Sequence, residues 1–124
     1  MDILVTTPKR EHETAEQEAE AVSADPNSFW FRTLRGRPNV KAGDRVYYVD
    51  GGFIRGYGIV FDVEEGEMWD DAHERTWAGT HLKQRKWVWL RQPVAFRGFQ
   101  GFRYVDKIPG LREKLNANEF DPQK

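Results

Sequence analysis

The residues of this chain best suited to binding a charged ligand are arginines that alternate with tryptophans. Within residues 85–91, the side chains spaced two apart are Arg85, Trp87, Trp89 and Arg91. If this segment is a strand, all four point to one face, and Val88 and Leu90 face the core. Exposed tryptophan rings stack on nucleobases and guanidinium groups contact phosphates, which favours single-stranded nucleic-acid binding. In the alternative interpretation, the tryptophans form the core and the arginines extend from its ends into solvent.

A second pair with the same spacing is Trp30 and Arg32. The ring can stack on a base while the guanidinium group bonds to a base edge or to a phosphate. Alternatively, Trp30 caps a barrel and Arg32 pairs with a carboxylate of the acidic residues 64–74. The basic loop that follows adds Arg35 and Arg37 as further candidate phosphate ligands.

The glycine-rich segment 97–104 interleaves basic and aromatic residues. Gly98 and Gly101 expose backbone N–H groups to an anion, which Arg97 and Arg103 could clamp. The segment has neither the spacing nor the ending of a Walker loop. In the alternative interpretation it is a hairpin turn whose phenylalanines pack under the sheet; these are Phe96, Phe99 and Phe102.

Signals for catalysis are weak by comparison. His12 lacks the second histidine of a zinc-protease motif, and the chain has no nucleophile-elbow motif. Asp70, Asp71 and His73 could hold a metal ion, but adjacent acids in an acidic segment are usually solvated. His73 and His81 could act as acid and base in RNA cleavage, although nothing in their spacing brings them together. We therefore predict no catalytic residue, no metal and no cofactor.

The charge is segregated along the 124 residues, although the net charge is only −1. Residues 63–77 carry six acidic side chains and one basic one, whereas residues 78–105 carry six basic and no acidic ones. Such a chain can present a basic face, although each run is equally consistent with a solvated surface. The absence of cysteine excludes disulfides and cysteine-based zinc sites and favours a cytoplasmic location. We expect no membrane segment and no signal peptide, because no apolar run approaches ~20 residues and the N-terminus is acidic.

Short alternating segments between turn residues predict a β-rich fold. Strands are expected at residues 3–6, 28–34, 45–49, 53–63, 86–96 and 102–105. Asp50-Gly51-Gly52 is a strong hairpin signal. Gly56 and Gly58 within the following strand indicate a bend or the close approach of another group. Residues 64–80 are predicted to be irregular, with a helical turn near residues 69–77.

Helices are expected near both ends of the chain. Residues 9–22 are rich in Glu and Ala and have a thin apolar stripe, which predicts a helix packed outside the strands. A short second helix is expected to open at Pro109-Gly110-Leu111 and to run through Leu115. We predict one domain over residues 1–115 and a disordered tail over residues 116–124.

Several of these segments resemble the PUA-like superfamily, which holds the PUA, ASCH and EVE domains. The resemblance covers roughly residues 3–104 and rests on a strand–helix–strand opening and on three motifs. The motifs are Phe29-Trp30-Phe31-Arg32, Gly43-Asp44-Arg45-Val46-Tyr47-Tyr48-Val49 and Gly56-Tyr57-Gly58-Ile59-Val60. The resemblance implies a pocket for a base, often a modified one, lined by Trp30 and Arg32. ASCH-type members include an amidohydrolase of a modified cytidine with Lys, Thr and Glu in its site; here Thr33 follows Arg32, and no lysine precedes it within the strand.

The sequence thus predicts a mainly β (α+β) fold, a small PUA-like β-barrel of five to six strands with an N-terminal and a short C-terminal helix packed outside. The predicted function is binding of RNA, or of a modified base in DNA, through a basic and aromatic cleft without catalysis. The candidate binding residues are Trp30, Arg32, Arg35, Arg37, Arg85, Trp87, Arg91, Arg97 and Arg103. Two alternatives stay open. One is a nucleoside hydrolase or ribonuclease using Glu64, Glu65 or a histidine, and the other is a protein-interaction or ligand-sensing barrel with the acidic helix as partner surface. The oligomeric state is not defined by the sequence.

Overall fold

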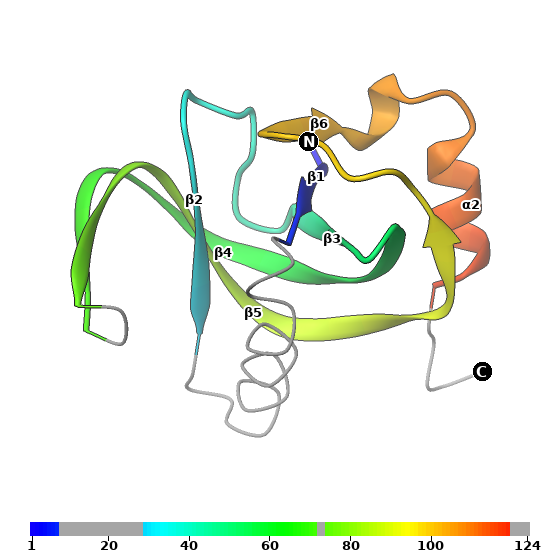
Figure 1. Cartoon of the computed structure of the whole chain (residues 1–124), viewed down its shortest axis with the longest axis horizontal. Helices are drawn as coiled ribbons and strands as arrows, with labels where there is room; N and C mark the ends of the chain where they lie inside the picture. Colours follow the sequence, from blue (N-terminus) through cyan, green and yellow to red (C-terminus); the bar gives the residue numbers. More distant parts are fainter. Residues whose placement is uncertain (8–28, 72–73, 120–124) are drawn as a thin grey trace.

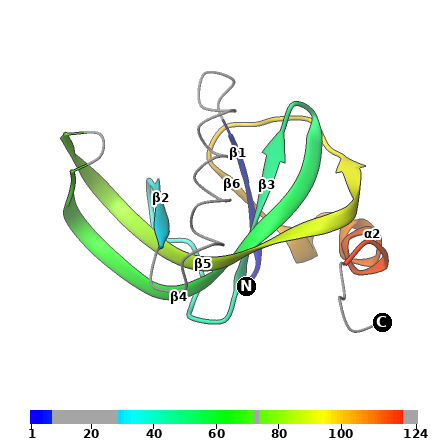
Figure 2. The same ribbon diagram turned by 90° about the horizontal axis from the view of Figure 1, so that it is seen from below.

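The computed structural model describes residues 1–7, 29–71 and 74–119, which form one curled sheet with a short helix beside it (Figure 1). The strands are β1 (Ile3–Thr6), β2 (Trp30–Leu34), β3 (Arg45–Asp50), β4 (Phe53–Asp70), β5 (Arg75–Ala95) and β6 (Phe102–Tyr104). Their order across the sheet is β2-β5-β4-β3-β1-β6. Strands β1 and β3 are parallel, and the other neighbouring pairs are antiparallel. The sheet curls into a half-barrel (Figure 2), which confirms the expected small, mainly β barrel.

The tight hairpin between β3 and β4 forms where Asp50-Gly51-Gly52 predicted it. Gly51 and Gly52 have φ angles of 60° and 84°. Glycine adopts this left-handed region without the steric cost of a side chain, so the chain can reverse within two residues. The register then places Asp50 opposite Phe53 and carries β3 and β4 side by side into the body of the sheet.

The prediction for residues 64–80 is wrong, because β4 and β5 continue through this region as a paired, two-stranded ribbon. We call residues 64–70 and 75–80 the acidic ribbon; it projects beyond β2 (Figure 1). Most of its side chains are exposed on both faces, including Trp69, which is 57% exposed. Because neither face is buried along most of its length, the ribbon needs no alternation of apolar and polar residues, and that alternation is the usual sequence signal for a strand.

Side-chain contacts, rather than a buried core, hold the ribbon strands in register. Gly66 lies opposite Gly79, and both have left-handed φ angles, of 115° and 138°. The indole N–H of Trp77 donates to the Asp70 carboxylate at 3.2 Å, and the guanidinium group of Arg75 lies 3.9 Å from the centre of the Trp77 ring. The contact between Trp77 and Asp70 joins β5 to β4, and cross-strand pairs of this kind stabilise an exposed two-stranded ribbon, whereas Arg75 and Trp77 are neighbours on one face of β5.

Two apolar cores lie on opposite faces of the sheet. The core on the side of helix α2 (Leu111–Ala117) consists of Leu4, Tyr47, Val49, Ile54, Tyr57, Leu90, Val94, Val105, Leu111 and Leu115. The core on the side of β2 consists of Ile3, Val5, Leu34, Val40, Val46, Val60 and Leu82. Strand β1 shows the alternation directly, since Leu4 joins the first core and its neighbours join the second.

The C-terminal helix forms as expected, but the predicted tail begins too early. A short 3-10 helix, η2 (Val105–Lys107), leads into α2, which extends through Ala117 and lies beside the end of β5 (Figure 1). Beyond the helix, Glu119 pairs with Leu90 of β5 as an isolated β-bridge. Residues 116–119 are therefore part of the fold, and residues 120–124 lie outside the described residues. The predicted N-terminal helix at residues 9–22 also lies outside them.

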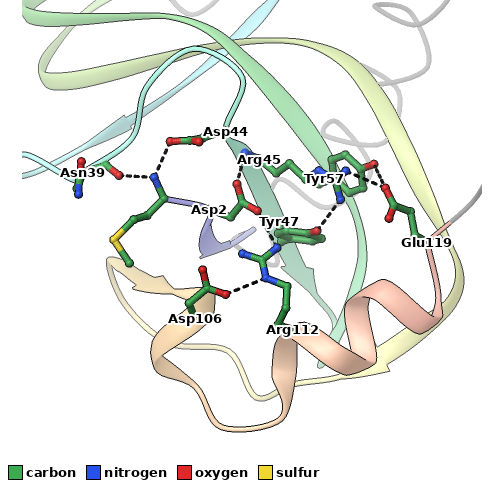
Figure 3. A network of polar contacts seen from close by, with 10 residues as sticks. Asp2, Asn39, Asp44, Arg45, Tyr47, Tyr57, Asp106, Arg112 and Glu119 are labelled. Carbon is green, nitrogen blue, oxygen red and sulfur yellow. Dashed lines mark hydrogen bonds and ion pairs between the residues drawn. The ribbon is translucent and has the colours of Figure 1, made fainter.

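A network of ion pairs joins the start of the chain to α2 and to the segment after it (Figure 3). Arg112 of α2 binds Asp2 and Asp106, with both N···O distances 2.8 Å. The hydrogen bond that Arg112 donates to Asp106 raises the pKa of Arg112, and the same contact lowers the pKa of the Asp106 carboxyl. The contact between Arg112 and Asp106 thus stabilises the charged form of both of these partners.

Arg45 occupies the second half of this network. Its guanidinium group donates to Glu119 at 2.8 Å and to the Tyr47 hydroxyl at 3.2 Å, and lies 4.4 Å from the centre of the Tyr57 ring. Burial raises the pKa of Tyr57 to about 12 despite the nearby guanidinium charge. Arg45 and Glu119 are 74 positions apart in sequence, so this contact attaches the C-terminal segment to β3.

Candidate nucleic-acid interface

Strand β2 is one edge of the sheet and carries the first candidate pair. Its register on β5 places Trp30 opposite Gln84 and Arg32 opposite Leu82. Phe31 points to the other face, where its ring meets the rings of Trp77 and His81 edge-on. The predicted alternation along β2 is confirmed, because Trp30 and Arg32 share a face with Leu34 of the β2-side core.

An aromatic cluster surrounds Trp30 on that face. We use this name for Trp30, Tyr48, Trp87 and Trp89. The Trp87 ring lies 6.2 Å from the Trp30 ring, 5.4 Å from the Tyr48 ring and 5.2 Å from the Trp89 ring, between centroids. Trp30 and Trp87 are half-buried, and Trp89 is 41% exposed. Strands β2, β3 and β5 therefore bring together rings that are far apart in the sequence.

Two glycines of β4 make room for this cluster and for the buried amide of Gln84. A Cβ atom at Gly56 would collide with the Trp87 ring, and one at Gly58 would collide with Trp30 and Gln84. The prediction that another group approaches β4 at these glycines is thus confirmed.

A chain of hydrogen bonds fixes the tilt of the Trp30 ring. Its indole N–H donates to the Tyr48 hydroxyl at 3.0 Å, and that hydroxyl donates to the amide oxygen of Gln84 at 2.8 Å. Gln84 is fully buried, and its amide nitrogen donates to the Leu82 carbonyl. The indole N–H of Trp87 is also buried, and it has no hydrogen-bond partner among the described residues. The cluster therefore combines oriented ring faces with one unused buried donor.

The segment 85–91 does not form the four-residue face that alternation predicted. Arg85 lies opposite Ile59 and Val88 lies opposite Tyr57, so β5 has one residue more than β4 across this interval. Lys86 accommodates the extra residue with a left-handed φ of 58°.

The bulge separates Arg85 from the tryptophan side chains. Its guanidinium group lies 4.0 Å from the centre of the Phe61 ring. Val88 and Leu90 do pack against the α2-side core, as expected. The structure thus brings Trp87 to the aromatic cluster and directs Arg85 to a separate aromatic surface.

A basic cavity of about 460 Å³ lies beside the aromatic cluster, between the end of β2 and the loop before β6. It is lined by Arg32, Thr33, Leu34, Arg35, Gln100, Gly101 and Phe102. No acidic side chain is among these lining residues, and Arg32 and Arg35 make no ion pair within the described part of the chain. The alternative interpretation, in which Arg32 pairs with a carboxylate of residues 64–74, is therefore wrong.

Thr6, at the end of β1, connects the two walls of this basic cavity. Its carbonyl accepts a hydrogen bond from Arg32 at 3.2 Å, and its hydroxyl accepts one from the Phe99 backbone N–H at 3.1 Å. Arg32 is therefore oriented by the sheet, and its other N–H donors have no partner among the residues that the structure describes. Sequence reasoning missed Thr6, Gln84 and Gln100, since none of them stands in a recognisable motif.

The remaining candidate arginines are exposed and lie at separate places. Arg37 pairs with Glu65 of the acidic ribbon at 3.5 Å. Arg103 lies 5.1 Å from the centre of the Phe99 ring. Arg91 and Arg97 have exposed side chains. The structure therefore brings the rings of Trp30 and Trp87 together and brings Arg32 and Arg35 to one cavity, but it does not gather the other candidate arginines with them.

The phenylalanines near the glycine-rich loop serve the fold. Phe96 and Phe99 pack against the α2-side core and against each other, with ring centroids 5.9 Å apart. Phe102 packs against the β2-side core. This agrees with the interpretation of residues 97–104 as a turn over packed rings, and Gly101 still lines the basic cavity.

The groups considered for catalysis are held in structural contacts where the structure describes them. His81 is fully buried between the Thr33 hydroxyl and the Gly66 carbonyl, both at 2.8 Å. Glu64 pairs with Lys83 at 2.9 Å, and Glu65 pairs with Arg37. His12 and His73 lie outside the described residues. No group of three potential metal ligands gathers within the described ranges, where no helix is long and apolar enough to cross a bilayer either.

The same architecture occurs in the crystal structure of ASCH from Zymomonas mobilis. The superposition covers 97% of this chain and 96% of that one, with a TM-score of 0.60 and 12% sequence identity. The chain therefore shares the fold of that ASCH structure, as the sequence resemblance implied. No protein-family model matches the chain, and no curated protein matches it.

Proposed function

We propose that this protein binds nucleic acid, as RNA or as DNA carrying a modified base, and performs no chemistry on it. The observation that carries the proposal is the position of Trp30 and Arg32 on one face of β2. The ring of Trp30 joins the aromatic cluster, and the guanidinium group of Arg32 lines the basic cavity. A base and its phosphate lie a few ångströms apart, so neighbouring sites for stacking and for anions suit a nucleotide.

The physical basis is that stacking and phosphate contacts act through separate parts of the face. A ring surface attracts a base irrespective of its identity, and arginine binds phosphate oxygens through several N–H groups at once. The buried amide of Gln84 serves to orient the rings, because it accepts the hydrogen bond of the Tyr48 hydroxyl that holds the Trp30 indole.

The test is the affinity of the full chain for short RNA, unmodified DNA and methylated DNA, measured by fluorescence anisotropy. Trp30→Ala should weaken binding by ~1–3 kcal/mol, the cost of one lost stacking contact. Trp69→Ala is the matched control, because it removes an exposed tryptophan from the acidic ribbon. Thermal melting of both variants shows whether they remain folded. Normal binding by a folded Trp30→Ala variant, or no binding of any oligonucleotide by the wild type, contradicts the proposal.

A further inference from the structure

The basic cavity has features of a preformed anion site. Its two charged side chains are both arginines, and Gln100 contributes a neutral amide. Gly101 has a left-handed φ of 78°, so the backbone of the loop turns sharply at the cavity wall. Successive backbone N–H groups at such turns are available to anions. A cavity lined by two guanidinium groups without a carboxylate has a positive potential that an anion would neutralise.

Arg32 is held in position before any ligand arrives. Thr6 accepts its hydrogen bond and also fixes the glycine-rich loop through the Phe99 backbone N–H. A Cβ at Gly98 would lie only 3.2 Å from the Thr6 methyl group, so the loop packs closely on β1 at this point. Both walls of the cavity are thus attached to one residue of β1, which reduces the entropy lost when a ligand binds.

The side chain of Arg35 is less restrained than that of Arg32. Its side chain is exposed, and no ion pair restrains it within the described ranges. One fixed arginine and one exposed arginine can approach an anion from two directions, as in many phosphate sites. The cavity volume of about 460 Å³ is in the range of small-ligand sites and exceeds what a simple ion needs.

We propose that this cavity is a phosphate-binding subsite in which Arg32, Arg35 and the backbone around Gly101 hold one phosphate group of the nucleic acid. The inference rests on the proposed function. It assigns the base to the aromatic cluster and the phosphate to the basic cavity. The phosphate is either the terminal monoester of an oligonucleotide or an internal diester. Both present the same oxyanion chemistry, and the experiment distinguishes them.

The first measurement is an NMR titration of the full chain with inorganic phosphate, with sodium chloride at matched ionic strength as the reference. Phosphate should shift the backbone amide signals of Leu34, Gln100 and Gly101, and chloride should not. Arg35→Glu should abolish these shifts while the rest of the spectrum stays unchanged, because this side chain is exposed. Lys114→Glu is the matched control, since it makes the same charge change on the exposed face of α2.

The second measurement compares the affinities of one RNA sequence with and without a 5′-phosphate. If the subsite holds a terminal monoester, the phosphorylated RNA binds about tenfold more tightly, the value of one charge-assisted hydrogen bond, and Arg35→Glu removes that difference. If it holds an internal diester, Arg35→Glu weakens both RNAs equally.

The outcomes separate the subsite from the proposed function. Phosphate shifts confined to the exposed arginines Arg91 and Arg97, or oligonucleotide affinities unchanged by Arg35→Glu, overturn the subsite even if RNA binds. Phosphate shifts at Gly101 without binding of any oligonucleotide support an anion site and overturn the proposed function.

Discussion

Two sets of arginines in this protein lie in opposite electrostatic surroundings. Arg45 and Arg112 each contact carboxylates at 2.8 Å, in the network that joins the two ends of the described chain (Figure 3). Arg32 and Arg35 line the basic cavity and have no carboxylate partner among the residues that the structure describes. The two sets carry the same charge, and only their neighbours differ.

The difference separates a structural from a binding role. An arginine already paired with carboxylates gains little from a phosphate, because it would first have to lose its partners. An arginine without such a partner keeps its positive potential available to an anion. The comparison predicts that substitutions in the network lower stability, whereas those at the cavity lower affinity.

The largest effect is expected for Arg112→Ala. The substitution leaves Asp2 and Asp106 without their shared partner, and loss of charge-assisted hydrogen bonds should lower the free energy of unfolding by about 2 kcal/mol. Arg35→Ala is the matched comparison and should change stability by less than about 0.5 kcal/mol, as exposed substitutions usually do. Urea denaturation measures both values. Equal losses of unfolding free energy in the two variants would contradict the assignment of Arg112 to stability and of Arg35 to binding.

A smaller effect concerns the salt dependence of binding. Each phosphate neutralised on a single strand contributes about −0.7 to the slope of log affinity against log salt concentration. Arg35→Ala should make this slope shallower by about that amount, and Arg112→Ala should leave it unchanged. Anisotropy titrations at several salt concentrations give the slopes. A slope that changes only in Arg112→Ala would reverse the roles of the two sets.

The smallest effect is a pH dependence within the network. Arg112 lowers the pKa of Asp106 below its ordinary value of 3.8. The contribution to stability is therefore present above pH 3.8 and is lost as the pH falls through the lower folded value. It is small because the Asp106 side chain is 53% exposed. Between pH 5 and about pH 2, the free energy of unfolding should fall less in Asp106→Asn than in the wild type. Denaturation curves recorded at each pH measure this difference. A larger loss in the variant would contradict the assigned direction.

The sequence predicted the features that depend on local chemistry. The hairpin followed from Asp50-Gly51-Gly52, and the crowding at β4 followed from Gly56 and Gly58. The faces of β2 followed from simple alternation, which also placed Trp30 and Arg32 together. In each of these cases the signal and its cause lie within a few residues of each other.

The features that sequence reasoning missed depend on contacts between distant segments. The bulge at Lys86 requires a left-handed backbone at a residue other than glycine, for which the sequence carries no marker. The acidic ribbon lacks an apolar face, and Glu119 is ordered by Arg45 from far along the chain. Gln84 is buried beside Trp30, Tyr48 and Gly58, which come from three other strands. The sequence of β5 alone does not show these neighbours.

The most direct test of the two arginine roles is the NMR spectrum of the arginine side-chain Nε–H groups, recorded before and after adding a short RNA. The signals of Arg32 and Arg35 should shift on binding, because their guanidinium groups line the cavity. Those of Arg45 and Arg112 should stay in place, since their carboxylate partners remain bound. Shifts of Arg45 and Arg112 with unchanged signals for Arg32 and Arg35 would contradict the account.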